Sequence, residues 1–343
     1  MFKSIGIRGY KSIKSQNVDL GRVNILIGGN GAGKSNFMSV FNFMRIVCNG
    51  DLERFVEDYG GANPFLYMGR RNTGRISFEF GLNESGRGGL SAIELEFREA
   101  LNRLSLSIVD TYAESKRFSF DSINDEIARY FLPLRVYHFV DTGRTSPITE
   151  TCKVYDNRFL RGNGSNLASV LYYISVQYPR QFARIEDVIR SIAPSFDGFK
   201  LEPLRGNPSL IRLEWKQKGM YDEYMDAEDF SDGTLRMICL VTLLMQPDLP
   251  GVVLIDEPEL GLHPAALSLF CSLVKKASTD SQIIISTQSI DVVNQFTADD
   301  IIVCDNTGEE TVFRRLSESS LEDWQKEYTL GELWEKNVFG GNP

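Results

Sequence analysis

The chain of 343 residues is long enough for one large domain or two modest ones, and its hydrophobic content of 42% is ordinary for a globular protein. No apolar run reaches the length needed to span a bilayer, and the N-terminus alternates like a strand, so we expect a cytoplasmic protein without membrane contact. Five scattered cysteines with no C-x-x-C pair argue against a disulfide framework or a metal site and predict reduced thiols.

The net charge of −9 is spread unevenly along the chain. Residues 1–50 hold 7 Lys/Arg against 1 Asp/Glu, whereas residues 221–343 hold 7 against 23. This balance argues against indiscriminate binding of polyanions. A local basic surface remains open in the middle of the chain, either as a solvated helix face or as a surface for DNA or a protein partner; its residues are Arg158, Arg161, Arg180, Arg184 and Arg190.

The first motif is a glycine-rich loop between a predicted strand and a predicted helix. Residues 23–27 are an apolar run typical of a buried strand, and residues 36–47 show helical spacing of apolar side chains. Between them, Gly28-Gly29-Asn30-Gly31-Ala32-Gly33-Lys34-Ser35 fits the phosphate-binding pattern G-x-x-x-x-G-K-[ST]. In this pattern backbone N–H groups surround the phosphates, Lys34 reaches the β- and γ-phosphates, and the Ser35 hydroxyl binds Mg²⁺.

Roughly 180 residues separate this helix from the next motif. Residues 76–80, 93–97 and 104–108 alternate with a period of two and predict a small antiparallel sheet. Residues 136–140 predict another strand, which contains His138. Residues 168–192 look helical with a break at Pro179, and no sustained heptad pattern predicts a long coiled coil.

Ser231-Asp232-Gly233 precedes a predicted apolar helix at residues 234–245. Taken alone, the serine and aspartate indicate an ordinary helix cap. The position just upstream of the next motif resembles that of an ABC-type signature turn, and this resemblance implies a helix N-terminus that binds the γ-phosphate held by a second chain.

The apolar residues 252–255 predict a central strand that delivers Asp256 and Glu257 to the carboxyl edge of a sheet. Asp256 fits a carboxylate on the Mg²⁺ side of the site, and Glu257 fits the base that activates the attacking water. Two acidic residues that merely open a loop are the alternative, which the phosphate-binding loop disfavours.

In this order the motifs resemble the ABC-type ATPase heads of the SMC, RecF and OLD group. Residues 5–13 resemble the group's first strand and "F-K-S" turn, and residues 24–30 resemble its N-x-L-x-G-x-N approach to the loop. Residues 256–264 look like its Walker B and D-loop, which include His263, and residues 283–289 stand where the group has a strand ending in S-T-H-S. Two features favour stand-alone OLD-like ATPases: the residues of the D-loop, and Asp232-Gly233-Thr234 at the position where transporters have Gly-Gly-Gln.

Gln288 occupies the position where the group usually has a switch histidine. Its amide can sense a γ-phosphate but cannot take up a proton. No convincing Q-loop glutamine appears. The tail at residues 323–343 and the string around His138 are similar to one bacterial branch of these ATPases, so His138 is either a core or edge histidine or a nucleotide-proximal one. After the switch strand, too few residues remain for a Toprim nuclease domain.

The resemblance implies an α/β fold: a P-loop NTPase of the ABC-ATPase head type, with a mixed central sheet, an antiparallel β subdomain and a helical signature lobe. We expect lobe I at residues 1–145, the helical and signature lobe at 146–249, and the rest of lobe I at 250–343. ATP and Mg²⁺ are the expected cofactors, with Ser35 and Asp256 as metal ligands and Glu257 and Gln288 as catalytic residues. The expected nucleotide contacts are Asn30, Gly31, Ala32, Gly33, Lys34, Ser35 and Asn36, with Ser231, Asp232 and Gly233 of a second chain.

The leading hypothesis is therefore an ATP-hydrolysing switch that dimerises around two ATP molecules and controls a separate nuclease or other effector in anti-phage defence. The alternative is a RecF-like clamp that acts on DNA in repair. A nucleotide-gated scaffold that does not hydrolyse ATP is a third hypothesis, which the presence of Glu257 disfavours. A GTPase is disfavoured because no N-K-x-D motif is present.

Overall fold

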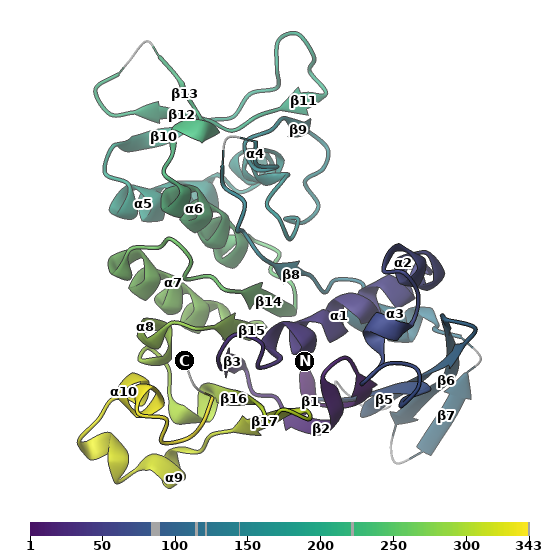
Figure 1. Cartoon of the computed structure of the whole chain (residues 1–343). Helices are drawn as coiled ribbons and strands as arrows, with labels where there is room; N and C mark the ends of the chain where they lie inside the picture. The colour runs from purple at the N-terminus through teal and green to yellow at the C-terminus, as the bar shows by residue number, and fades with distance from the viewer. Residues whose placement is uncertain (84–89, 114–115, 121, 144, 221–222, 342–343) are drawn as a thin grey trace. The chain divides into compact units, whose positions relative to one another are not determined.

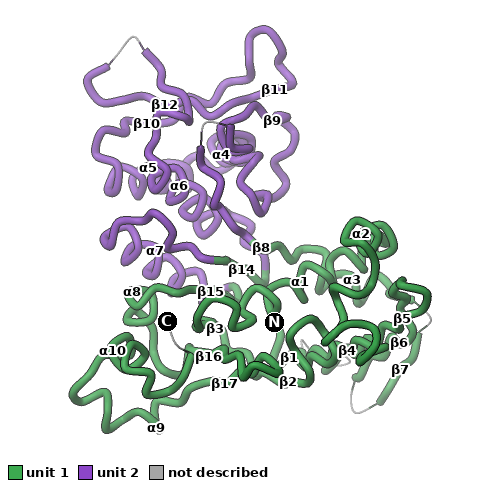
Figure 2. Tube along the Cα trace, in the orientation of Figure 1, with its two compact units in different colours: residues 1–136, 251–256, 281–343 green, residues 137–250, 257–280 purple. Residues whose placement is uncertain are grey.

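The computed structural model describes residues 1–83, 90–113, 116–120, 122–143, 145–220 and 223–341, so Asn342 and Pro343 of the predicted tail lie outside the described residues. The chain divides into two compact units (Figure 2). Unit 1 comprises residues 1–136, 251–256 and 281–343, and unit 2 comprises residues 137–250 and 257–280.

Unit 1 contains a six-stranded sheet around strand β3 (Val23–Ile27), except for Tyr137 at the end of one edge strand (Figure 1). The sheet order is β17 (Thr311–Arg315), β16 (Ile301–Asn306), β3, β15 (Gln282–Thr287), β14 (Val252–Asp256) and β8 (Val136–Tyr137). The pairs β14–β15, β15–β3 and β16–β3 are parallel, whereas β16–β17 is antiparallel. The predicted mixed central sheet is therefore confirmed.

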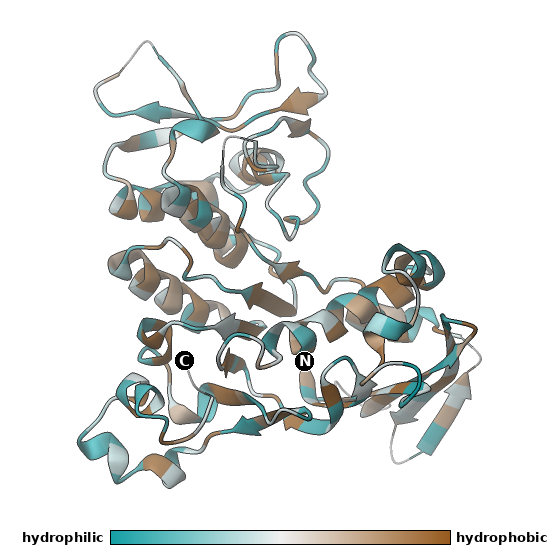
Figure 3. Ribbon diagram, viewed as in Figure 1, coloured by the Kyte–Doolittle hydropathy of each residue, from teal (hydrophilic) through white to brown (hydrophobic). Residues whose placement is uncertain are grey.

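The central strands are buried on both faces, as expected for parallel strands that read as continuous apolar runs. Every residue of β3 and β15 is buried, and β14 is strongly hydrophobic up to its last residue (Figure 3). Because these strands are parallel and adjacent, their carboxyl ends meet at one edge of the sheet. The functional side chains described below leave from this edge.

A second six-stranded sheet in unit 1 is entirely antiparallel, in agreement with the predicted antiparallel subdomain. Its order is β2 (Ile13–Asp19), β1 (Phe2–Tyr10), β4 (Arg75–Leu82), β5 (Ala92–Ala100), β6 (Arg103–Ala113) and β7 (Lys116–Phe120). Strand β4 alternates between buried and more exposed residues, so one face packs on the core. The predicted strands at 76–80, 93–97 and 104–108 are β4, β5 and β6.

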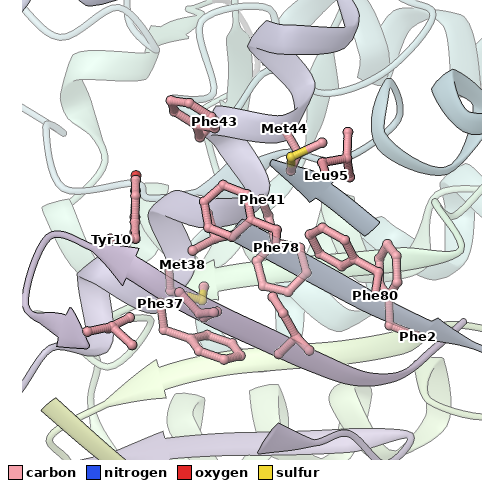
Figure 4. Close-up of a cluster of buried hydrophobic side chains, with 14 of the residues drawn as sticks. Phe2, Tyr10, Phe37, Met38, Phe41, Phe43, Met44, Phe78, Phe80 and Leu95 are labelled. Atoms are coloured by element: carbon pink, nitrogen blue, oxygen red, sulfur yellow. The ribbon is translucent and has the colours of Figure 1, made fainter. Parts of the chain in front are cut away.

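Helix α1 (Lys34–Cys48) packs an aromatic core against the strands (Figure 4). Phe41 lies 5.9 Å from Phe2 between ring centroids, and Phe43 lies 5.2 Å from Phe97. Burial of such side chains contributes roughly 1.5–3 kcal/mol each. This core fixes the helix that follows the carboxyl end of β3. The other helices of unit 1 are α2 (Leu52–Asp58), α3 (Asp125–Phe131), α8 (Ile290–Val293), α9 (Glu318–Leu321), α10 (Leu330–Glu335) and short 3-10 turns at Asn63–Phe65, Ala298–Asp300 and Trp324–Lys326.

Unit 2 is built mainly from helices α4 (Leu167–Gln177), α5 (Pro179–Ile192), α6 (Asp232–Met245) and α7 (Pro264–Ala277). Pro179 is the first residue of α5, where a missing N–H costs nothing, and the predicted break at this position is confirmed. Short strands complete the unit: β10 (Phe196–Lys200), β12 (Glu214–Gln217) and β13 (Met225–Asp226) in one sheet, β9 (Cys152–Lys153) and β11 (Leu210–Ile211) in another, with a 3-10 turn at Ala227–Asp229.

The predicted strand at residues 136–140 is wrong beyond Tyr137, where β8 ends. The N–H of His138 donates to the carbonyl of Gly162, and the carbonyls of Phe139 and Val140 accept from an arginine side chain. These backbone groups are therefore used outside a strand ladder. Within the described part of the chain, no helix is both long and apolar enough to cross a membrane.

Candidate functional site

The glycine loop after β3 owes its shape to backbone conformations that favour glycine. Gly28, Gly31 and Gly33 have φ values of 152°, 77° and 108°. A Cβ on Gly28 would lie 2.3 Å from the carbonyl oxygen of Cys304, and one on Gly33 would lie 2.4 Å from Oγ1 of Thr311. Both glycines therefore have a steric role as well as a conformational one, because β16 and β17 approach the loop closely.

Lys34 begins α1, and its ammonium group turns back into the loop. Its Nζ donates to the carbonyl oxygens of Gly28 and Gly29, the second at 3.1 Å, and the residue is only 5% exposed. A buried cation needs polar partners. The loop thus holds a positive charge at the start of a helix, where backbone N–H groups and the helix dipole also favour an anion.

Residues at the ends of the two strands that flank β3 form hydrogen bonds with the exposed residues of this loop. At the end of β15, Gln288 donates through Nε2 to Oδ1 of Asn30 at 3.1 Å, and at the end of β16 Asn306 donates through Nδ2 to the carbonyl of Gly31 at 3.2 Å. The predicted switch residue Gln288 therefore contacts the predicted nucleotide residue Asn30. The role of Asn306 could not be found from the sequence, because nothing local to it marks a contact with residue 31.

The first turn of α1 is tied to the β1–β2 turn. The side-chain Nδ2 of Asn36 donates to Oγ of Ser12 at 2.7 Å, and this hydroxyl lies 2.7 Å from Oγ1 of Thr311. The serine of the "F-K-S"-like turn thus links α1 to β17. Ser35, between Lys34 and Asn36, is exposed, which leaves its hydroxyl accessible at the same edge.

Asp256 lies at the carboxyl end of β14 beside Ser286 of β15. Ser286 in turn pairs with Leu26 of β3, two residues before the glycine loop, so the carboxylate and the loop share one sheet edge. The buried Ser286 hydroxyl donates to Oδ1 of Asp256 and thereby orients the half-buried carboxylate. The sequence had placed Ser286 only at the end of a predicted strand and gave no sign of its bond to Asp256.

The donors Ser35 and Asp256 fit Mg²⁺, which prefers oxygen ligands and commonly takes only one or two from the protein beside substrate phosphates. Within the described ranges, no group of three or more His, Cys, Asp or Glu side chains could hold a metal ion. A donor set of one hydroxyl and one carboxylate suits a metal shared with a bound phosphate.

Glu257 follows Asp256 directly, with a half-buried side chain and a φ of 48°. This left-handed conformation is uncommon for a residue other than glycine. Backbone outliers of this kind cluster at functional sites, where the surrounding structure enforces them. Here the residue with this conformation stands directly after β14, at the start of the segment that leads to α7.

In unit 2, the turn before α6 is a helix cap built against the D-loop. The Oγ of Ser231 accepts from the backbone N–H of Thr234 at 3.2 Å, while Ser231 and Asp232 are exposed. A Cβ on Gly233 would lie 2.3 Å from the carbonyl oxygen of Gly261, so only glycine allows this approach. His263 caps α7 by accepting from the N–H of Ala265 through Nδ1 at 3.3 Å.

Arg236 anchors the first turns of α6 inside unit 2. Its Nε donates to the carbonyl of Phe139 at 2.6 Å and its Nη2 to that of Val140 at 3.0 Å, and burial lowers the pKa of this guanidinium. The string around His138 therefore supplies acceptors to Arg236, whereas the His138 side chain is exposed. Sequence patterns had not marked Arg236.

Of the predicted site residues, unit 1 brings together Asn30 to Asn36, Asp256 and Gln288 at one sheet edge, and unit 2 holds Glu257 and the turn Ser231–Gly233. A glycine loop with a buried lysine, followed on neighbouring parallel strands by an aspartate and a glutamine, defines a P-loop NTPase. The mixed sheet, the antiparallel subdomain and the capped helix of unit 2 define the ABC-type head.

The chain belongs to the family described as "AAA domain, putative AbiEii toxin, Type IV TA system", whose model matches residues 23–294. This range begins with β3 and includes every predicted site residue. No curated protein gives a significant match to the chain.

Solved structures of SMC heads show the same fold. The SMC head bound to the C-terminal winged-helix domain of ScpA has a TM-score of 0.63 at 18% identity, over 95% of this chain and 99% of that chain. The head with an extended coiled coil, bound to the C-terminal domain of ScpA derived from Pyrococcus furiosus, gives 0.61 at 14%, over 95% and 98%. The SMC head from Thermotoga maritima gives 0.50 at 14%, over 92% and 99%. The predicted likeness to SMC-type ABC ATPase heads is confirmed at the level of fold.

Proposed function

We propose that this chain is an ATP-hydrolysing switch that dimerises around two ATP molecules and controls a separate effector. The observation that carries the proposal is the sheet edge on which the Lys34 ammonium, the Asn30–Asn36 loop and the oriented Asp256 carboxylate meet. A cation, a ring of backbone donors and a hard oxygen ligand are the groups that bind a triphosphate.

Each side chain has a role that its chemistry suits. When ATP binds, the Lys34 ammonium leaves the carbonyl oxygens of the loop and donates to phosphate oxygens instead. Ala32, Gly33 and Asn36 complete the loop and its first helical turn. Ser35 and Asp256 would hold Mg²⁺, which would neutralise phosphate charge. Glu257 accepts the proton of the attacking water. Gln288 donates to the γ-phosphate, and its hydrogen bond to Asn30 couples the bound phosphate to the loop.

Dimerisation completes the proposed site with Ser231, Asp232 and Gly233 of the second chain. Support comes from the exposure of Ser231 and Asp232 at the N-terminus of a helix of 14 residues, where backbone N–H groups attract anions. Gly233 packs on the backbone of Gly261, so the turn and the D-loop form one preformed surface. A two-fold arrangement would use this surface twice.

The effector is proposed to be a separate nuclease or another protein in anti-phage defence, by the likeness to stand-alone OLD-like ATPases. Two SMC heads of the same fold were solved bound to ScpA domains, which supports a protein partner for a head of this kind. The family description names a putative toxin. The growth of a host that expresses the chain alone distinguishes the two alternatives. A toxin would arrest growth, whereas an ATPase that acts through a separate effector would leave growth normal.

A RecF-like DNA clamp is the second candidate, and the exposed Arg158, Arg180 and Arg184 are the observation in its favour. Two other arginines of the same segment are less suited, because Arg161 pairs with Asp156 and Arg190 pairs with Glu186 and Asp187. The basic surface is thus partly neutralised. Salt-dependent DNA binding would favour this candidate.

The proposal is tested by phosphate release from ATP with Mg²⁺ in the wild type and in Lys34→Ala, with the exposed Lys14→Ala as the matched control. Lys34→Ala should abolish turnover, and Lys14→Ala should retain it. Normal turnover in Lys34→Ala would contradict the assignment of the loop.

A further inference from the structure

Residues 329–341, named here the C-terminal brace, lie outside the family match and contain none of the proposed site residues. The brace begins with α10, whose Gly331 N–H donates to Oδ1 of Asn294 at 2.7 Å. A Cβ on Gly331 would lie 2.4 Å from Cγ2 of Ile290 in α8. Helix α8 starts two residues after Gln288, so the brace packs against the helix that directly follows the segment with the predicted switch residue.

The middle of the brace is anchored by Trp334, which is fully buried at 0% exposure. Its Nε1–H donates to the carbonyl of Gly341 at 2.9 Å, and Arg314 of β17 donates to the carbonyl of Phe339. A buried indole with a satisfied N–H holds a chain segment rigidly. The chain after α10 is thereby returned to the central sheet.

Gly341 brings the brace to the base of the phosphate-binding loop. Its N–H donates to Oδ1 of Asp305 in β16 at 2.7 Å. A Cβ on Gly341 would lie 2.8 Å from Cγ1 of Val303 and 3.8 Å from Cα of Gly28. With a φ of 78°, this position favours glycine for conformation as well as for space.

The end of β16 therefore lies between the loop and the brace. Asp305 binds Gly341, while the neighbouring Cys304 approaches Gly28 through its carbonyl and Asn306 binds the carbonyl of Gly31. Gly28 is also the residue whose carbonyl accepts from Lys34. Displacement of the brace would therefore move the end of β16, which contacts the loop, and with it the loop carbonyls that orient the Lys34 ammonium.

We propose that the C-terminal brace positions the phosphate-binding loop for nucleotide, through the hydrogen bond of Gly341 to Asp305 at the end of β16 and with Trp334 as its anchor. These are positioning residues, since they act through the loop. The inference rests on the proposed function, because it requires that the loop binds ATP. It predicts that damage to the brace weakens nucleotide binding more than it slows the chemical step.

Trp334→Phe tests the anchor, since it keeps an aromatic ring but removes the donor to Gly341. Trp324→Phe is the matched control in the same C-terminal region, because Trp324 is 49% exposed. The probe is a non-hydrolysable ATP analogue with Mg²⁺, measured by calorimetry beside KM and kcat for ATP. Trp334→Phe should raise Kd and KM by roughly three- to ten-fold, as expected for one lost hydrogen bond, with kcat within about two-fold. Trp324→Phe should match the wild type.

Asp305→Ala and Asp305→Asn form a second pair of variants, which tests the brace independently if Trp334→Phe does not fold. The alanine variant loses the acceptor for Gly341 and should raise Kd similarly, whereas asparagine retains an acceptor oxygen and should restore most of the affinity. Equal Kd values for wild type, Trp334→Phe and Asp305→Ala would overturn the brace and leave the ATPase proposal intact. No binding by the wild type would overturn the proposed function itself.

Discussion

Ser286→Ala removes the donor that orients the Asp256 carboxylate while leaving every proposed nucleotide contact in place. The serine is fully buried and its hydroxyl donates to Oδ1 of Asp256. The replacement is smaller by one oxygen, so no clash arises. The half-buried carboxylate can recover solvent contacts but loses its fixed direction.

The magnitude follows from the kind of hydrogen bond that is lost. A bond to a charged group contributes about 1.5–3 kcal/mol, and each 1.4 kcal/mol corresponds to about ten-fold in an equilibrium constant. Loss of an outer partner of a metal ligand commonly lowers metal affinity about 10- to 100-fold. We therefore expect the Mg²⁺ concentration for half-maximal activity to rise by about 10- to 100-fold.

The assay is phosphate release at saturating ATP as a function of Mg²⁺, with thermal melts to confirm folding. The matched control is Ser281→Ala, because Ser281 is equally buried and stands just before the opposite end of β15. Ser286→Ala should approach the wild-type rate at high Mg²⁺, and Ser281→Ala should show the wild-type Mg²⁺ dependence. An unchanged midpoint in Ser286→Ala would refute the metal role of Asp256.

Glu257→Gln should retain ATP but lose turnover by at least about 100-fold, because it removes the base; gel filtration with ATP should then show a persistent dimer, and normal turnover would place the base elsewhere. Gln288→His should introduce a pH–rate inflection near about 6.5, absent in the wild type, since only the imidazole titrates there; an unchanged profile would separate Gln288 from the γ-phosphate. Burial raises the pKa of all five thiols, so native protein should resist iodoacetamide at pH 8 and react fully in urea, and rapid native labelling would contradict the burial. Since the folded thiols titrate above the unfolded value of 9.0, stability should also fall as pH rises past about 9. The thiols are Cys48 and Cys271, each with a pKa of about 12, and Cys152, Cys239 and Cys304.

The local parts of the fold were predictable because their signals lie within one segment. The glycines of the loop, the continuous apolar run of β14 and the alternation of β4 each specify a conformation without distant partners. Helix α1 begins two residues before the predicted start, because Lys34 belongs to the helix while turning back into the loop. Strand β7 escaped prediction because all five of its residues are exposed, so it has no buried face to produce a pattern.

The supporting contacts of the site were not predictable, because they depend on register between distant segments. Asn306 reaches Gly31 and Ser286 reaches Asp256 only because β16, β3, β15 and β14 are adjacent in this order. Gly341 likewise carries no sign in the sequence that it binds Asp305 beside the loop. Arg236 shows the same limit in unit 2, since its carbonyl partners Phe139 and Val140 lie almost 100 residues earlier.

Complementation between two inactive variants tests most directly whether the ATP site is shared by two chains. Lys34→Ala damages the loop and Ser231→Arg damages the exposed turn, so each variant alone should hydrolyse no ATP. In a mixed dimer, one of the two sites draws both its loop and its turn from intact motifs. We predict that the mixture regains a measurable part of the wild-type rate; mixed dimers that form and stay inactive would show that each chain builds its site alone.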